Sequence, residues 1–216
     1  MTNHLFDGLF DGVDQASHFA VLPQDRTITY RDVFETSAQL AHGLVALDVK
    51  PGDRVAAQVP KSIEAVLLYL ACVRSGAVFL PLNTAYTAAE LSYFVKDSGA
   101  VLLICSPEDN EEYRSIAGTA SCRLETLGAP DENGFASGTV MALAAQQPNQ
   151  FDNTQRGADD LAAILYTSGT TGRSKGAMLS HDNLLSNARA LTDLWQFTSS
   201  DVLLHALPIF HTHGLF

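Results

Sequence analysis

The alternation of short apolar runs with helix-like segments is the feature that most constrains the fold. Residues 54–59, 77–80 and 100–105 are apolar runs with the length of buried strands. Between them, the segments that begin at Ser62 and Thr87 repeat apolar side chains at helical spacing. Strands that alternate with helices favour an α/β fold with a largely parallel sheet.

Residues that begin and end helices mark several of these boundaries. Ser62 is a good N-cap, Thr87 and Glu90 have the spacing of a capping box, and the first of these helices should end near Gly76. Further elements are expected as a helix over about 180–195 and strands at 123–126, 161–166, 177–179 and 202–207.

The pattern predicts two α/β blocks, at about 50–127 and 160–216, which form two sheets or two halves of one layered domain. A surface segment, 128–158, joins them; it is rich in Gly, Pro, Asn, Gln, Asp and Ser around one weak helix at 140–145.

The charge balance excludes several classes of partner. The chain has 216 residues, 46% of them hydrophobic, and a formal net charge of −11. Such a surface repels nucleic acid and anionic membranes, so we expect neither as a partner, and an anionic ligand needs a local basic site. The longest apolar run, 65–73, is about half a membrane span. With no signal peptide and no CxxC motif, we expect a soluble, cytoplasmic protein whose oligomeric state is open.

Residues 166–176, YTSGTTGRSKG, concentrate anion-binding chemistry. They hold three glycines, five Ser or Thr hydroxyls and two cations. Glycine accepts positive φ, so backbone N–H groups can converge on a phosphate. The sequence differs from the common phosphate loop, because Gly176 follows Lys175, and we expect it to join two strands. An exposed turn is the less favoured alternative. The predicted ATP-binding residues are Thr167, Ser168, Gly169, Thr170, Thr171, Gly172, Arg173, Ser174 and Lys175.

Residues 207–214, LPIFHTHG, form the second candidate site. They follow a predicted strand at its carboxyl end, where ligands bind in open α/β sheets. Metal ligation is disfavoured, because His211 and His213 have no third ligand nearby. Contact with a substrate, and a loop with one capping and one packed histidine, are equally open on these residues alone. Elsewhere, we expect His205 in the core and solvated side chains for Lys61 and Arg74.

These motifs resemble those of the adenylate-forming enzymes, which include acyl-CoA synthetases, luciferases and nonribosomal adenylation domains. Residues 166–176 resemble the family's phosphate loop, and 207–214 resemble its second core motif, whose histidine lies by the acyl pocket. The resemblance covers almost the whole chain and is weakest at 106–158. Residues 76–86, 159–166 and 205–216 are most similar to the malonyl-CoA synthetases within this family.

The resemblance implies a truncated form of the large N-terminal domain, an AMP-binding domain of layered αβ sheets, without the family's C-terminal domain. It implies ATP-dependent ligation of malonate to coenzyme A through malonyl-AMP, with Mg²⁺ as cofactor and release of AMP and pyrophosphate. Thr171 would help to bind Mg²⁺, His211 would act at the reacting carboxylate, and Thr212 and His213 would shape the substrate pocket. Residues 1–216 alone would be inactive. The alternatives are an acyl-CoA synthetase for another small carboxylic acid and a non-catalytic nucleotide-binding fragment.

Overall fold

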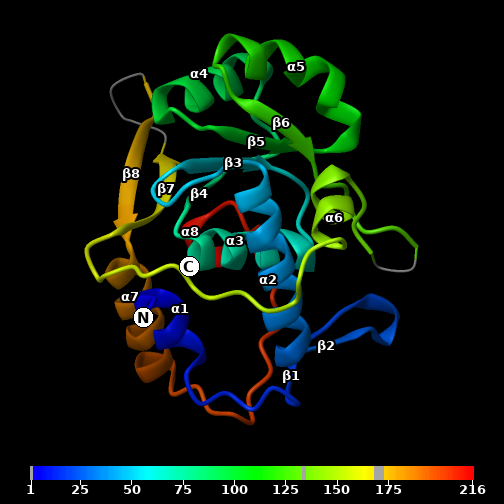
Figure 1. The fold of residues 1–216 in the computed structure, drawn as a ribbon. Helices are drawn as coiled ribbons and strands as arrows, with labels where there is room; N and C mark the ends of the chain where they lie inside the picture. Colours follow the sequence, from blue (N-terminus) through cyan, green and yellow to red (C-terminus); the bar gives the residue numbers. More distant parts are fainter. Residues whose placement is uncertain (1, 133–134, 168–172) are drawn as a thin grey trace.

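A six-stranded sheet forms the centre of the computed structural model, which describes residues 2–132, 135–167 and 173–216 (Figure 1). The strand order is β6-β5-β3-β4-β7-β8. The strands are β3 (Arg54–Gln58), β4 (Val78–Pro81), β5 (Leu102–Cys105), β6 (Arg123–Thr126), β7 (Leu161–Thr167) and β8 (Lys175–Ser180).

The sheet is mixed. Strands β3 to β7 pair in parallel, and only β8, which follows β7 along the chain, pairs antiparallel. The predicted α/β class is confirmed. The pairing of β4 with β7 places strands from both predicted blocks side by side in one sheet.

Helices cover both faces of the sheet (Figure 1). On one face lie α2 (Tyr30–Ala46) and α3 (Ile63–Ser75), and on the other lie α4 (Ala88–Ser98) and α5 (Asn110–Thr119). Alternate strand residues supply the two cores, because side chains along a strand point to opposite faces. Phe79 packs in the core under α3, whereas Leu80 packs in the core with α4.

The predicted helix boundaries are confirmed. Ser62 caps α3, and its side chain accepts a hydrogen bond from the Ala65 N–H. Gly76 ends α3 with φ of 75°, a left-handed conformation in which a Cβ is disfavoured. Thr87 and Glu90 form the capping box at the start of α4.

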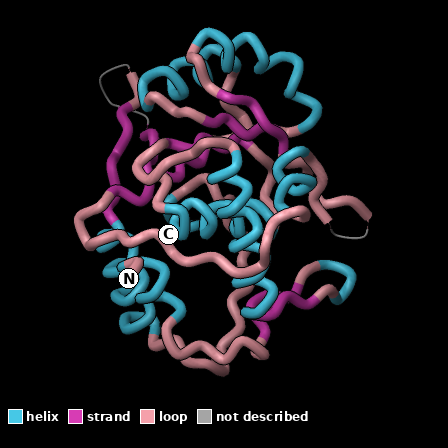
Figure 2. Tube along the Cα trace, viewed as in Figure 1, coloured by secondary structure: helices cyan, strands magenta, loops and turns pink. Residues whose placement is uncertain are grey.

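The remaining elements surround this sandwich. Figure 2 shows long loop tracts between them. These remaining elements are α1 (His4–Phe10), β1 (His18–Val21), η1 (Pro23–Asp25), β2 (Thr27–Thr29), η2 (Pro107–Asp109), α6 (Thr139–Ala144), α7 (His181–Trp195) and α8 (Thr212–Leu215). Strands β1 and β2 form a separate antiparallel hairpin, and α1 packs against α7. No helix among the described residues is long and apolar enough to cross a membrane.

The predicted strand at 202–207 is wrong. The segment runs between α7 and α8 without strand pairing, and its side chains are exposed, Val202 by 93% and Leu204 by 90%. A strand needs a neighbour that accepts and donates its backbone hydrogen bonds, and no neighbouring strand lies beside this segment in the described part of the chain. Apolar composition alone therefore misled the prediction.

Arg74 is also placed differently from the expectation, because it is buried rather than solvated. Its guanidinium donates to the Phe34 carbonyl at 2.6 Å, to Ser37 Oγ at 2.9 Å and to Asn153 Oδ1 at 2.8 Å. Burial lowers the pKa of Arg74 to about 10, so the side chain stays charged at neutral pH. Arg74 thus ties α3 to α2 and to the segment that precedes β7.

Candidate functional site

The glycine-rich stretch joins two antiparallel strands, as predicted. Tyr166 pairs with Gly176, and Thr167 pairs with Lys175, at the ends of β7 and β8. Thr167, Arg173 and Lys175 are exposed. Within the described residues, the Lys175 ammonium has neither a hydrogen bond nor an ion pair, so it is available to an anion. The other predicted phosphate-binding residues lie outside the described residues: Ser168, Gly169, Thr170, Thr171 and Gly172.

Helix α4 holds both ends of this stretch. The Tyr93 hydroxyl donates to the Ser174 carbonyl at 3.0 Å, and the Tyr166 hydroxyl donates to Asp97 Oδ2 at 2.6 Å. The Arg173 guanidinium lies 5.2 Å from the centre of the Tyr93 ring. Burial, with the hydrogen bond to Asp97, raises the pKa of Tyr166, so this hydroxyl remains a donor at neutral pH.

Tyr93 and Asp97 were not predicted as site residues from the sequence. Their i, i+4 spacing on α4 places them on one face of the helix, which is the signal that could have found them. Their partners are about 70 to 80 residues away in the chain, and local patterns do not report such pairs.

The second motif surrounds the start of α8. His211 is the residue before this short helix, Thr212 and His213 lie in its first turn, and all three side chains are exposed. The Phe210 and His211 rings are in contact, with centroids 4.7 Å apart. Among the described residues, no group of three His, Cys, Asp or Glu side chains is placed to hold a metal ion.

Buried contacts fix the backbone on both sides of His211. Ile209 is buried and, together with Ala57, Val59 and Leu82 among others, lines a small cavity. Gly214 passes so close to Pro208 that a Cβ would meet the Pro208 carbonyl oxygen at 2.0 Å. No larger residue fits there without a backbone shift.

One residue near this motif departs from the expectations, and a second makes contacts that were not predicted. His205 is exposed rather than in the core, and its Nε2 lies 2.6 Å from the Gly214 carbonyl oxygen. Lys61 is exposed, as expected, and it also donates from Nζ to the His205 and Leu207 carbonyls at 2.7 and 2.8 Å. These carbonyls are more than 140 residues from Lys61 in the chain.

Both motifs lie at the same edge of the sheet. Thr167 ends β7, which runs parallel to β4, and Ile209 packs beside Pro81 and Leu82 at the carboxyl end of β4. The carboxyl edge of parallel strands is where open α/β sheets bind ligands. The structure therefore brings the described ends of the glycine-rich stretch and an exposed histidine to one edge of the sheet.

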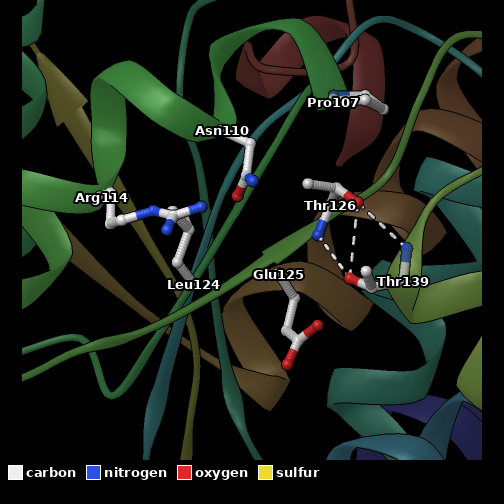
Figure 3. A pocket seen from close by; sticks show the side chains of 7 residues that line it. All are labelled: Pro107, Asn110, Arg114, Leu124, Glu125, Thr126 and Thr139. Atoms are coloured by element: carbon white, nitrogen blue, oxygen red, sulfur yellow. Dashed lines mark hydrogen bonds between the residues drawn. The ribbon is translucent and has the colours of Figure 1, made fainter.

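A separate opening of about 430 Å³ lies between α5, β6 and α6 (Figure 3). Figure 3 shows Thr126 and Thr139 joined by hydrogen bonds: each backbone N–H donates to the other's Oγ1, at 2.8 and 3.0 Å. None of the predicted site residues that the structure describes borders this opening, which is lined by Pro107, Asn110, Arg114, Leu124, Glu125, Thr126 and Thr139.

Comparison with known proteins agrees with this arrangement. The family model described as AMP-binding enzyme matches residues 12–216. The chain belongs to the AMP-binding enzyme family. Its resemblance to the adenylate-forming enzymes is thereby confirmed.

Relatives within this family act on different acids. The chain is 37% identical over 165 residues to a malonate–CoA ligase of Arabidopsis thaliana, covering 76% of this chain and 27% of the relative. It is also 37% identical over 188 residues to a feruloyl-CoA synthase of Amycolatopsis sp, covering 87% of this chain and 35% of the relative.

Solved structures of MatB from Rhodopseudomonas palustris match the whole chain at 50% identity. The TM-score is 0.94 for the apo form and 0.93 for the ATP-bound form. The chain covers 42% of the MatB chain, so it spans less than half of this neighbour's length. The expected N-terminal fold of the adenylate-forming enzymes, truncated relative to MatB, is confirmed.

Proposed function

We propose that the protein containing this chain is an AMP-forming acid–thiol ligase that joins malonate to coenzyme A. The observation that carries the proposal is the meeting of two motif segments at one sheet edge, in a chain of the AMP-binding enzyme family. The malonate–CoA ligase among the relatives supports malonate as the acid, and the whole-chain match to the ATP-bound MatB structure supports ATP as the other substrate.

The proposed reaction has two steps. A carboxylate oxygen of malonate attacks the α-phosphorus of ATP, and pyrophosphate leaves with the electrons of the broken P–O bond. The coenzyme A thiol, after losing its proton, then attacks the malonyl carbonyl carbon, and AMP leaves. The first step brings two anions together, so it requires positive charge and hydrogen-bond donors at the phosphates.

Residues 167–175 would supply those groups. Arg173 and Lys175 are exposed cations on a chain whose net charge is −11, so they offset a field that otherwise repels ATP. The bonds from Tyr93 to the Ser174 carbonyl and from Tyr166 to Asp97 tie the ends of the stretch to α4 and limit the conformational freedom lost when phosphate binds. Phosphate contacts for Ser168 to Gly172 belong to the same proposal.

His211 would act at the reacting end of malonate. An exposed imidazole can donate a hydrogen bond to a carboxylate oxygen, and its neighbours fix its backbone. Thr212 and His213, on the adjoining turn, would bound the pocket on the side of the distal carboxylate.

Mg²⁺ belongs to the proposal only through Thr171, which lies outside the described residues. The described residues offer no cluster of three candidate side-chain ligands for a metal ion. This fits an ion held chiefly by substrate phosphates, where Mg²⁺ neutralises charge, rather than by a protein cage.

A carboxylate panel tests the acid. The protein, made at the length of its relatives, is given ATP, coenzyme A and one of malonate, oxalate, acetate, succinate or ferulate, and pyrophosphate release is measured. Malonate is expected to give the highest kcat/KM by about tenfold or more. If another acid is preferred, the protein is a ligase for that acid. If no acid supports release, a non-catalytic nucleotide-binding protein is the better account.

The isolated chain provides a second arm of the same test. Residues 1–216 are expected to give no malonate-dependent pyrophosphate release, because the chain covers only 42% of MatB. Release from this chain alone would contradict the expectation that further residues complete the site.

A further inference from the structure

The backbone before His211 has little support of its own. Between 202 and 210, no backbone group pairs with another strand or helix in the described part of the chain. The side chains of Val202, Leu203 and Leu204 point largely into solvent. A segment of this kind moves freely unless specific contacts hold it.

Lys61 makes two of those contacts. It is an exposed residue in the short connection between β3 and α3, and it immediately precedes Ser62, the N-cap of α3, so its backbone is held between two buried elements. Its ammonium donates to the carbonyls of His205 and Leu207 at 2.7 and 2.8 Å. Among the described residues, no other side chain hydrogen-bonds to the backbone of 202–210.

The bond geometry suits a lysine. Carbonyls two residues apart on an extended backbone point to one side, and a single ammonium with three donors can reach both. Because the donor is charged, each bond is stronger than one between neutral groups. The two contacts therefore fix the direction of the chain as well as its position.

The segment continues into a closed turn that ends at α8. His205 Nε2 contacts the Gly214 carbonyl, Ile209 is buried beside β3 and β4, and the Phe216 ring packs on Tyr69 of α3 with centroids 5.3 Å apart. His211 lies inside this turn. Displacement of His205 and Leu207 is thus transmitted to His211 through a short, constrained path.

We propose that Lys61 is a positioning residue for residues 205–214, which we name the acyl-binding turn. Its ammonium holds the His205 and Leu207 carbonyls and thereby sets the place of His211. The expected change in the KM for the acid rests on the proposed function. The contact of Lys61 with the two carbonyls does not. Lys61 is too far along the chain from the second motif for any local sequence pattern to indicate this role.

The test uses the protein at the length of its relatives, with the variants Lys61→Met and Lys61→Arg. Lys96→Met is the matched control, because Lys96 is an exposed lysine whose ammonium makes no hydrogen bond or ion pair within the described residues. Two quantities are measured for each variant: amide hydrogen exchange of residues 202–210, and KM for the acid and for ATP.

Lys61→Met is expected to speed amide exchange at 202–210 and to raise the KM for the acid about tenfold, the factor that corresponds to losing one to two charge-assisted hydrogen bonds at an exposed site. The KM for ATP should change less than about twofold, because the phosphate stretch is held by α4. Lys61→Arg keeps the charge and the donors and should recover most of both effects. Lys96→Met should match the wild type.

The outcomes separate this inference from the proposed function. Unchanged exchange at 202–210 in Lys61→Met contradicts the contact, whatever the enzyme does. Faster exchange with an unchanged acid KM contradicts the positioning role. If no acid supports pyrophosphate release from the wild type, the proposed function fails, and the positioning role fails with it. Amide hydrogen exchange at 202–210 still tests whether Lys61 holds the segment.

Discussion

The parallel strands β3, β4 and β5 and the segment from β8 to α8 differ sharply in burial. Nearly every residue of the three strands is buried, whereas four of the six residues of β8 and most of the tract after α7 are exposed. Two leucines show the contrast: Leu103 is fully buried and Leu204 is 90% exposed. Yet the exposed region carries Lys175 and His211, the residues that point to a function.

This difference teaches how the candidate site is built. The buried strands and their helices form a scaffold, and the motif segments attach to its carboxyl edge through a few specific contacts. Tyr93 and Asp97 hold the two ends of residues 166–176, and Lys61 holds the carbonyls of His205 and Leu207. Functional residues carried on weakly supported segments above a rigid scaffold are common, because such segments can adjust to ligands.

The largest effect is expected when leucine is replaced by alanine in each of the two regions. Leu103→Ala removes a fully buried side chain and should lower the free energy of unfolding by about 2–5 kcal/mol. Leu204→Ala removes an exposed one and should change it by less than about 0.5 kcal/mol. Urea unfolding followed by circular dichroism measures both. Equal costs at the two sites would mean that Leu204 is covered in the protein.

Gly214→Ala places a side chain where the turn around His211 is most closely packed. A Cβ would lie 2.0 Å from the Pro208 carbonyl oxygen, so the backbone around His211 must move. We expect a fall of about 100-fold in kcat/KM for the acid, the cost of misplacing a reacting group by about 1 Å. Gly118→Ala is the control, since open space surrounds Gly118. Wild-type kinetics in Gly214→Ala would show that the placement of this turn has no role in activity.

His181, the first residue of α7, makes stability depend on pH. Its ring is fully buried, and neither ring nitrogen has a hydrogen-bond partner within the described residues. Burial, with the nearby Arg156 and His4, lowers the pKa of His181 to about 4, against an opposing effect of Asp160. Between pH 6.5 and 4 the unfolded chain therefore binds a proton that the folded chain does not, and stability falls as pH falls.

The corresponding measurement is urea unfolding at pH 7.5 and pH 5.0. Relative to the wild type, His181→Gln should remove about 2 kcal/mol of the stability lost between these pH values. His18→Gln, at an exposed histidine, is the matched control. A pH dependence that is the same in His181→Gln and in the wild type would show that this imidazole does not titrate abnormally.

The smallest expected effect concerns one hydroxyl at the base of the phosphate stretch. Tyr166→Phe removes the 2.6 Å bond to Asp97 but keeps the ring packed on Phe94. The KM for ATP should rise about fivefold, and the KM for the acid should not change. Tyr30→Phe serves as control, because the Tyr30 hydroxyl makes no hydrogen bond among the described residues, while its ring contacts are kept. A rise in the KM for the acid without a rise in the KM for ATP would contradict the role of Tyr166 in the phosphate stretch.

The sequence predicted the scaffold well because its signals are local. The caps at Ser62 and Thr87, the stop at Gly76 and the length of each apolar run lie within single elements. The predicted strand at 202–207 failed because a strand depends on a neighbour that the run itself does not specify.

The candidate site divides in the same way. The motif residues were found from composition and resemblance, and the structure places the described ones at one sheet edge. Lys61, Tyr93, Asp97 and Arg74 were missed or misjudged, because each acts on backbone or side chains far along the chain. Such contacts follow from the fold, and a single sequence contains no pattern that pairs their members.

Amide hydrogen exchange, with and without ATP and malonate, tests most directly that the exposed motif segments form the ligand site. In the protein at the length of its relatives, peptides covering 166–176 and 205–214 should gain protection when both ligands are added. Strands β3, β4 and β5 should be protected already and change little. Protection that appears instead around the opening lined by Asn110, Arg114 and Glu125, with none at the two motif segments, would contradict the account.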